Sequence, residues 1–161
     1  MDGKTVTTSG EYRNDWRYGR WEFRDAQGAI VQTMEYRPEP RRTFGFLITT
    51  DYGNENGPYR RYFPDGSLEE EGQFISGYYE GRLKRYHRNG KLALEGTLHR
   101  DEPVGLWKSY YASGTLYREM HYQDGKLQGA LRVYDPDGRL KYSTEYSAGQ
   151  KIGPDELIQN P

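Results

Sequence analysis

Three histidines are the side chains of this sequence best suited to metal binding or acid-base chemistry at neutral pH. They are His87, His99 and His121, and the chain of 161 residues contains no cysteine that could add a thiolate ligand or nucleophile. A metal site or a catalytic triad would need the histidines to converge on one point. Whether they converge depends on the elements that carry them.

A second candidate for a metal site is the segment Asp135-Pro136-Asp137-Gly138, which resembles the opening of a calcium-binding loop. A calcium loop needs further oxygen ligands and a closing glutamate at its twelfth position, and this segment is followed by neither. Proline presets φ, aspartate bonds to its own backbone and glycine accepts a positive φ, so the same residues are typical of a β-turn. We therefore expect a turn here and no bound metal.

The densest basic stretch runs from Arg82 to Lys91, and with Tyr86 it could stack on and neutralise a nucleic acid strand. The chain as a whole has 23 basic and 24 acidic side chains and a net charge of -1, so it supplies no general attraction for phosphates. The acidic run Glu69 to Glu71 is expected on a neighbouring strand, where cross-strand ion pairs would neutralise the basic stretch. We therefore expect no binding of nucleic acid.

The elements that must position these residues follow from an internal repeat of 24 residues. Two sets of glycines keep this spacing, the second set nine residues after the first: Gly57, Gly81, Gly105, Gly129 and Gly153, then Gly66, Gly90, Gly114 and Gly138. Three further positions repeat in step: Tyr62, Tyr86, Tyr110 and Tyr134, then Leu68, Leu92, Leu116 and Leu140, then Phe74, Leu98, Tyr122 and Tyr146. Five positions that recur in four repeats indicate a structural repeat.

Each repeat is predicted to be a β-hairpin. Phe63-Pro64-Asp65-Gly66 and its equivalents are turn sequences, and after them apolar and polar residues alternate with the period of two that a strand requires. No window long enough for a helix shows helical spacing without meeting a glycine. The fold class predicted is all-β: an elongated antiparallel sheet of tandem 24-residue hairpins.

The hairpins would keep the three histidines apart. His87 falls by one turn, His99 by the opposite turn and His121 within a strand of the next repeat. We therefore expect solvated histidines, no catalytic residues, no cofactor and no enzymatic activity.

The repeat predicts a single array over 1–161 rather than separate domains. Its parts are expected at 4–18 (a partial repeat), 19–36, 57–80, 81–104, 105–128 and 129–152, with a tail at 153–161. Tyr36 to Gly57 spans 21 residues where Phe74 to Gly81 spans 7, so 14 extra residues lie within 37–56, the segment that we call the insertion. Within it Thr43 to Thr50 is predicted to be an extra strand. This insertion either binds a partner or widens the sheet as a longer hairpin.

Aromatic residues must supply much of the packing, because only 34% of the chain is hydrophobic while 16 residues are tyrosine. In a single sheet, large rings can cover neighbouring strands. Gly72 and Gly96 are expected to leave bare backbone that such a ring covers. Trp107 and Tyr110 are three residues apart, so either both faces carry aromatic rings or a bulge intervenes.

The pattern Gly-x-(Tyr/Trp)-x-x-Tyr, then Gly-x-Leu-x-x-Glu-Gly, then an aromatic residue and a further glycine, resembles the MORN-repeat variant. It is clearest from Gly57 to Gly153. Proteins made almost only of this variant are similar to the YwqK-type antitoxins, which are encoded beside secreted polymorphic toxins. The resemblance implies a MORN-like hairpin fold and a bacterial immunity protein that binds a toxin domain; it supplies no catalytic residues.

The last repeat departs from this pattern. The glutamate present as Glu71, Glu95 and Glu119 is replaced by Ser143, and the glycine after it becomes Met120 and then Thr144 in the last two repeats. These departures predict a closing repeat or a local surface.

Partner binding is predicted on the aromatic sheet face, on a basic row and in the insertion. The candidate residues are Trp107, Tyr110, Tyr111 and Tyr122, the row Arg60, Lys84, Lys108 and Arg132, and Arg41, Arg42, Phe44 and Phe46. Aromatic and arginine side chains carry much of the energy of protein interfaces. The row is either simply solvated or a docking surface for an acidic partner.

These observations leave two functions open. The first is a non-enzymatic antitoxin that binds a cognate toxin domain, and the second is a scaffold that aligns partners along an array, with exposed edge strands through which it could oligomerise. A hydrolase would need a cluster of acid, base and nucleophile that the sequence does not offer. We read no signal peptide and no membrane span, and we expect a cytoplasmic protein.

Overall fold

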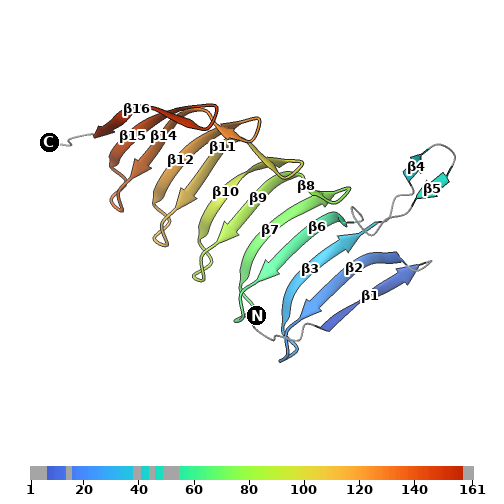
Figure 1. Ribbon diagram of the computed structural model, residues 1–161. Helices are drawn as coiled ribbons and strands as arrows, with labels where there is room; N and C mark the ends of the chain where they lie inside the picture. The colour runs from blue at the N-terminus through green and yellow to red at the C-terminus, as the bar shows by residue number, and fades with distance from the viewer. Residues whose placement is uncertain (1–6, 14–15, 38–40, 44–45, 49–54, 158–161) are drawn as a thin grey trace. The chain divides into compact units, whose positions relative to one another are not determined.

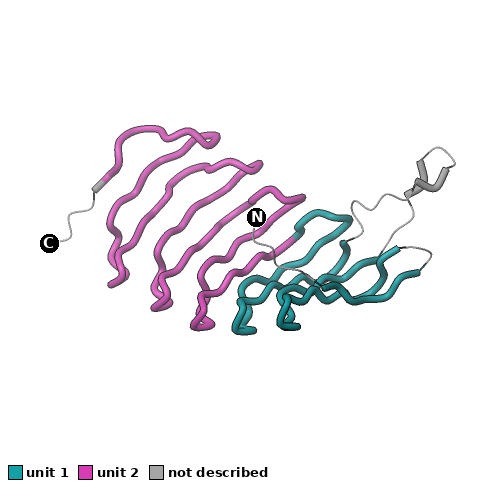
Figure 2. Tube along the Cα trace, turned by 60° about the horizontal axis from the view of Figure 1, so that its bottom comes forward, with its two compact units in different colours: residues 1–80 teal, residues 81–161 magenta. Residues whose placement is uncertain are grey.

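The computed structural model describes residues 7–13, 16–37, 41–43, 46–48 and 55–157, and the regular structure of these residues is entirely β-strand (Figure 1). They divide into two compact units, unit 1 at 1–80 and unit 2 at 81–161 (Figure 2). The division falls directly before Gly81, one of the repeating glycines.

Unit 1 contains an antiparallel sheet in which consecutive strands are neighbours. Its strands are β1 (Thr7–Arg13), β2 (Trp16–Arg24), β3 (Ile30–Tyr36), β6 (Glu55–Tyr62), β7 (Leu68–Ile75) and the short β8 (Tyr78–Tyr79). They pair in the order β1-β2-β3-β6-β7, with β8 on β7.

Two further strands of unit 1 lie in the predicted insertion. They are β4 (Arg41–Thr43) and β5 (Phe46–Ile48), and they pair only with each other among the described strands. The prediction of one continuous strand from Thr43 to Thr50 is therefore wrong. Thr43 and Phe46 belong to two different strands, in which Arg41 pairs with Ile48 and Thr43 pairs with Phe46. Residues 44–45 and 49–54 lie outside the described residues.

Unit 2 continues the same pattern. Its strands are β9 (Gly81–Tyr86), β10 (Leu92–His99), β11 (Glu102–Tyr110), β12 (Leu116–Gln123), β13 (Lys126–Leu127), β14 (Gly129–Tyr134), β15 (Leu140–Ser147) and β16 (Gln150–Leu157). They pair antiparallel in the order β9-β10-β11-β12-β14-β15-β16, with β13 on β12.

The predicted turn sequences form the predicted turns. In the first, the Gly66 N–H donates to the Phe63 carbonyl at 2.9 Å and the Phe63 N–H donates to the Ser67 carbonyl at 2.9 Å. Gly66 has a φ of 83°, which glycine accepts without a steric penalty. The same pair of bonds recurs in the turns that begin at Asp25, His87, Tyr111 and Asp135. The predicted fold class, an antiparallel sheet of tandem hairpin repeats, is confirmed in each unit.

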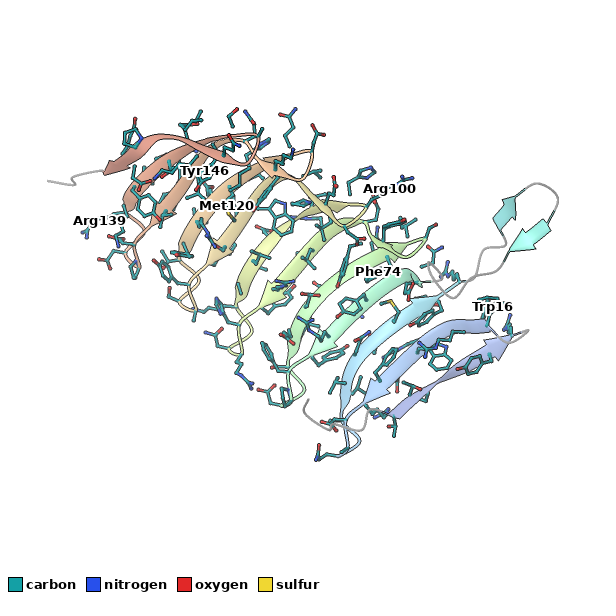
Figure 3. All side chains as sticks on the ribbon, in the orientation of Figure 1. Trp16, Phe74, Arg100, Met120, Arg139 and Tyr146 are labelled. Atoms are coloured by element: carbon teal, nitrogen blue, oxygen red, sulfur yellow. The ribbon has the colours of Figure 1, made fainter. Side chains whose placement is uncertain are left out.

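The two faces of each sheet differ. We call the face that carries the buried side chains the packing face; it presents Trp21, Met34 and Tyr59 in unit 1 and Leu83, Trp107, Met120 and Val133 in unit 2. Residues one position along each strand point to the opposite face, which we call the ladder face. Figure 3 shows side chains on the strands of both units, with Met120 among those labelled.

The packing face of unit 1 is an aromatic cluster. Trp21, Met34, Tyr36 and Tyr59 are buried together, with Phe23, Phe74 and Tyr79 packed against them. The ring of Tyr59 meets those of Phe74 and Tyr79 edge-on, each at a centroid distance of 5.6 Å. Large rings thus replace the second layer that most sheets have.

In unit 2 an indole ring covers bare backbone. A Cβ atom added at Gly96 would overlap the indole of Trp107 on the next strand. Gly96 is therefore required for close approach of the ring, as the sequence predicts. Trp107 also lies opposite Met120 and edge-on to Tyr122, at a centroid distance of 6.0 Å.

Both arrangements considered for Trp107 and Tyr110, rings on both faces and a bulge, occur in the structure. Trp107 lies on the packing face, whereas the Tyr110 hydroxyl reaches Glu95 on the ladder face. The register of β11 and β12 also shifts between Ser109 and Tyr110. Aromatic rings therefore occupy both faces, and a bulge lies beside them.

Candidate functional site

The ladder face of unit 2 carries a series of glutamates that are held by tyrosines of the following repeat. The Tyr110 hydroxyl donates to Glu95 Oε1 at 2.9 Å, and 24 residues on, the Tyr134 hydroxyl donates to Glu119 Oε2 at 3.0 Å. Each bond joins a strand of one repeat to a strand of the next. The periodic tyrosines and glutamates therefore fix neighbouring repeats to each other.

Cations complete this arrangement. Arg82 lies 3.3 Å from Glu95 and Lys108 lies 3.3 Å from Glu119. In unit 1, Arg60 lies 3.7 Å from Glu71. Five of these six charged groups, all except Arg82, belong to periodic positions that the sequence identifies. The basic row is thus interleaved with carboxylates, so it does not present a field of uniform sign.

The phenols of the ladder remain protonated donors over a wide pH range. Burial, together with the hydrogen bond to Glu95, raises the pKa of Tyr110 to about 12. Burial and the bond to Glu119 raise the pKa of Tyr134 in the same way. A phenolate beside a carboxylate would be repelled, so the ionised form is disfavoured.

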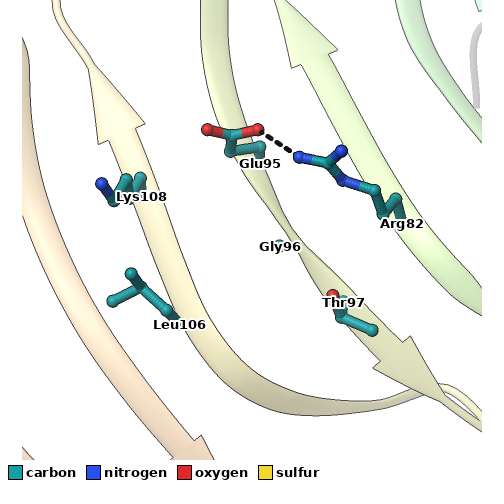
Figure 4. Close-up of a pocket in the computed structure, with 6 residues that line it drawn as sticks. All are labelled: Arg82, Glu95, Gly96, Thr97, Leu106 and Lys108. Atoms are coloured by element: carbon teal, nitrogen blue, oxygen red, sulfur yellow. Dashed lines mark hydrogen bonds and ion pairs between the residues drawn. The ribbon is translucent and has the colours of Figure 1, made fainter.

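A hollow of about 160 Å³ opens on this face at the centre of β10 and β11. It is lined by Arg82, Glu95, Gly96, Thr97, Leu106 and Lys108. Figure 4 shows the ion pair of Arg82 and Glu95 on one side and Leu106 with Lys108 on the neighbouring strand. Gly96 contributes only backbone to this hollow, because a Cβ atom there would point to the packing face, where the Trp107 indole lies.

The chemistry of the hollow is that of a binding surface. Leu106 is an exposed apolar side chain, with 52% of its area open to solvent, and it lines the hollow together with the cations Arg82 and Lys108. The Arg82 side chain is 74% exposed and can reorient, whereas Glu95 is held by two partners. An apolar centre with a polar rim is typical of small protein interfaces.

The ladder ends in the last repeat. Arg132 pairs in register with Ser143, at the position where earlier repeats have a glutamate. Among the described residues, Arg132 and the equivalent Lys84 form no ion pair. These two cations are therefore the members of the basic row that remain available to a partner.

One edge of unit 2 is tied together by its turns. The imidazole Nε2 of His87 lies 2.8 Å from the Tyr110 carbonyl, and the Tyr111 hydroxyl donates to the Tyr134 carbonyl at 2.8 Å. Asn89 Nδ2 donates to the Ala112 carbonyl at 2.7 Å. Each turn thus bonds to the next repeat, which positions successive hairpins.

The residues predicted to bind a partner do not form one patch. Lys84, Lys108, Arg132 and the Tyr110 hydroxyl lie on the ladder face of unit 2, and Trp107 and Tyr122 lie on its packing face. Tyr111 lies at the turn edge and Arg60 belongs to unit 1. Arg41, Arg42 and Phe46 belong to β4 and β5, and Phe44 lies outside the described residues.

Five residues of the hollow are not among the residues that the sequence predicts to bind a partner: Arg82, Glu95, Gly96, Thr97 and Leu106. A signal for Leu106 exists, since it follows a repeating glycine at a position that is polar, proline or alanine in the other repeats. A leucine there has no packing role in the repeat, which indicates an exposed apolar side chain.

The candidate metal ligands have other roles. Asp135 Oδ1 accepts hydrogen bonds from the backbone N–H groups of Asp137 at 3.0 Å and Arg139 at 2.9 Å, which closes a β-turn. His87 lies in a turn, His99 at the end of β10 and His121 within β12. In the part of the chain that the structure describes, no three histidine, aspartate or glutamate side chains gather as a metal site would require.

Comparison with known families identifies the repeat. Residues 55–76, 79–99 and 103–124 match the family described as the MORN repeat variant. The chain therefore contains MORN-type repeats, and the matched segments include β6 to β12 with the hollow. No curated protein matches the chain as a relative. Among the described residues, no helix is long and apolar enough to cross a membrane.

Proposed function

We propose that this protein is a non-enzymatic binding protein that holds a protein partner on the ladder face of unit 2. The observation that supports the proposal is the hollow on this face, which exposed Leu106 lines together with Arg82 and Lys108. A leucine that is half open to solvent on a rigid sheet gains free energy when a partner covers it, at roughly 25 cal/mol per Å² of apolar area.

The carboxylates of the hollow suit binding better than catalysis. Glu95 accepts the Tyr110 hydroxyl at 2.9 Å and lies 3.3 Å from Arg82. A carboxylate that already accepts a hydrogen bond and an ion pair directs its oxygens at groups of its own chain. The role we assign to it is to orient Arg82, whose guanidinium then offers the remaining donors to a partner's carboxylate or carbonyl groups.

The partner proposed is a cognate toxin domain in the bacterial cytoplasm. This part rests on the resemblance of the repeats to those of the YwqK-type antitoxins. Neutralisation would follow from covering or distorting the toxin's active site. Trp107 is 8% exposed in the free protein, so we assign the first contact to Leu106 and the cations around it, and we assign Trp107 the role of packing beneath them. We propose a second contact with the partner through the insertion residues Arg41, Arg42, Phe44 and Phe46.

The proposal is tested by titrating the protein with the product of the neighbouring gene in a calorimeter. Leu106→Asp should weaken binding ~10-fold or more, which corresponds to about 1.4 kcal/mol. The matched control is Ile75→Asp, because Ile75 is 47% exposed but lies in unit 1. Rescue of cells that express the toxin should follow the same order.

Two results would count against the proposal. Equal losses from Leu106→Asp and Ile75→Asp would remove the hollow from the binding site. Failure to bind any neighbouring gene product, combined with a molecular mass that rises with concentration, would favour the scaffold function instead.

A further inference from the structure

The outer strands of the two units each pair on one side. Among the described strands, β1 pairs with β2 and β16 pairs with β15. Every residue of β1, from Thr7 to Arg13, is exposed, and so are residues 150–156 of β16. Backbone N–H and C=O groups at such edges are available to a further strand.

The register shows which strand of a hairpin β1 represents. Ser9 pairs with Glu22, and Glu95 pairs with Lys108. The residue numbers of the two pairs differ by the same offset of 86 (95 minus 9, and 108 minus 22). The same offset relates Thr8 and Phe23 to Leu94 and Ser109. β1 is therefore the equivalent of β10, whose other side is paired with β9.

β16 represents the opposite kind of strand. Ser143 pairs with Glu156 just as Glu95 pairs with Lys108, here with an offset of 48 residues (143 minus 95, and 156 minus 108). β16 is therefore the equivalent of β11, whose other side is paired with β12. The free side of β16 is thus shaped for a strand of the β1 type, and the free side of β1 for a strand of the β16 type.

Within the described strands, one glycine and one aromatic residue at these edges have no cross-strand partner on the open side, whereas their equivalents do. In every complete hairpin the first repeating glycine pairs with a large apolar or aromatic residue: Gly19 with Tyr36, Gly57 with Phe74, Gly81 with Leu98, Gly105 with Tyr122 and Gly129 with Tyr146. The equivalents at the edges are Gly153 on β16 and Tyr12 on β1. Tyr12 is 60% exposed and Gly153 has a φ of 84°, so each has the form that the pair requires.

We propose that β16 of one copy of this protein pairs with β1 of a second copy in the register of a normal repeat. Gly153 would then lie opposite Tyr12, Asp155 opposite Gly10 and Glu156 opposite Ser9, as Gly81, Leu83 and Lys84 lie opposite Leu98, Gly96 and Glu95. The junction is heterologous, because it joins two different surfaces. It goes beyond the proposed function, since it uses neither the hollow nor the toxin.

Proline in β16 does not prevent this pairing. Pro154 directly follows its repeating glycine, and Pro58 holds the same place in β6. β6 pairs with β3 on one side and with β7 on the other, and Pro58 itself is in register with Gln73. A proline at this position is therefore compatible with a strand that is paired on both sides, although proline elsewhere in a central strand would remove a ladder bond.

The charges at the junction are also compatible. Glu156 would stand between Ser143 of its own chain and Ser9 of the second copy, both of which are neutral. Like charges directly opposite each other would oppose pairing, and this register avoids them.

The experiment uses the absence of cysteine in the natural sequence. Ser9→Cys and Glu156→Cys are made as separate variants, one carrying a size tag, and are mixed under mild oxidation. Residues directly opposite on one face have Cβ atoms about 4.5–5.5 Å apart, which is close to the separation that a disulfide spans. The proposal predicts a disulfide-linked pair that contains one copy of each variant, and a wild-type mass that rises with concentration in sedimentation.

The matched control replaces Ser9→Cys with Thr8→Cys. Thr8 is exposed like Ser9 but is one residue out of register, so its side chain points to the other face of the sheet. It should give no disulfide with Glu156→Cys. Equal yields from Thr8→Cys and Ser9→Cys, or no disulfide from either with unchanged circular dichroism, would overturn the proposal. The disulfide result does not depend on whether the protein binds a toxin, so this test is independent of the proposed function.

Discussion

Trp21 of unit 1 and Trp107 of unit 2 occupy the same position in the repeat, yet their surroundings differ. Each is in register with a methionine, Met34 or Met120. Each ring also covers a glycine, because a Cβ atom at Gly10 would overlap Trp21 and one at Gly96 would overlap Trp107. The repeat therefore fixes the backbone and the covered glycine in both places.

Other neighbours of the two rings are not repeated. Trp21 Nε1 donates to the Glu11 carbonyl at 3.3 Å, and the Arg17 guanidinium lies 4.6 Å from the ring centroid. Tyr12 meets the same ring edge-on at 4.9 Å. Trp107 Nε1 is buried without a hydrogen-bond partner in the described residues.

The sequence explains this difference. Pro103 stands where Arg17 does and Leu98 where Tyr12 does, so the Trp107 indole keeps the ring of Tyr122 but has no equivalent of the Arg17 cation or the Tyr12 ring. Trp21 is 2% exposed and Trp107 is 8% exposed. The comparison teaches that a repeat position determines where a ring lies, whereas non-repeated neighbours determine how firmly it is held.

The largest expected effect comes from filling the covered glycines. Gly96→Ala should destabilise the fold by ~2–3 kcal/mol, because the added methyl group overlaps the indole of Trp107 between two paired strands. Gly10→Ala should cost less, since β1 is an edge strand that can move. Urea unfolding monitored by circular dichroism measures both. An equal cost at the two sites would contradict the role assigned to the edge.

The next effect separates the two indoles. Trp21→Phe should cost about 1–2 kcal/mol more than Trp107→Phe, because only Trp21 loses a hydrogen bond and a stacked cation. Both substitutions remove a similar ring area, so each serves as the control for the other. A larger cost for Trp107→Phe would reject this explanation of the comparison.

A smaller effect is expected at a turn that contacts neither tryptophan. Ala148 has a φ of 49° and precedes Gly149. Ala148→Asn should stabilise the protein by about 0.5–1 kcal/mol, because Asn-Gly favours this type of turn. The gain should add to the cost of Trp107→Phe in the double variant, and a failure of additivity in thermal unfolding would show that the two sites are coupled.

The smallest effect is a loss of stability at high pH. The pKa of Tyr110 is raised to about 12, so above pH 10 the unfolded chain releases this proton before the folded protein does. Stability is therefore complete below pH 10 and falls as the pH rises towards 12. Solvent near this partly exposed phenol screens the effect. Urea titrations at pH 9 and pH 11 should show a smaller loss in Tyr110→Phe, and an unchanged loss would contradict the prediction.

The fold follows from the sequence because glycine spacing is a local signal. Turn residues and positive φ values depend on a few neighbouring residues, so the position of Gly66 predicts its hairpin. The ring over Gly96 is also predictable, since a glycine in a strand leaves room for a neighbour.

The site is less predictable because it depends on side-chain direction beside bulges. The shift between Ser109 and Tyr110 sends the tyrosine hydroxyl to Glu95 while Trp107 stays on the packing face. Sequence identifies Lys108 as part of a basic row but does not show that Glu119 is its partner. The hollow at Leu106 also depends on Arg82 and Glu95, which lie on two other strands, 24 and 11 residues away in the chain.

Hydrogen exchange in the complex shows which strands the partner covers. The product of the neighbouring gene is added, and amide exchange is compared with that of the free protein. If the partner binds at the hollow on the ladder face of unit 2, amide exchange should slow from Glu95 to Lys108 and stay unchanged in β2 and β3 of unit 1. Protection confined to unit 1, or no protection in a complex that forms, would contradict this prediction.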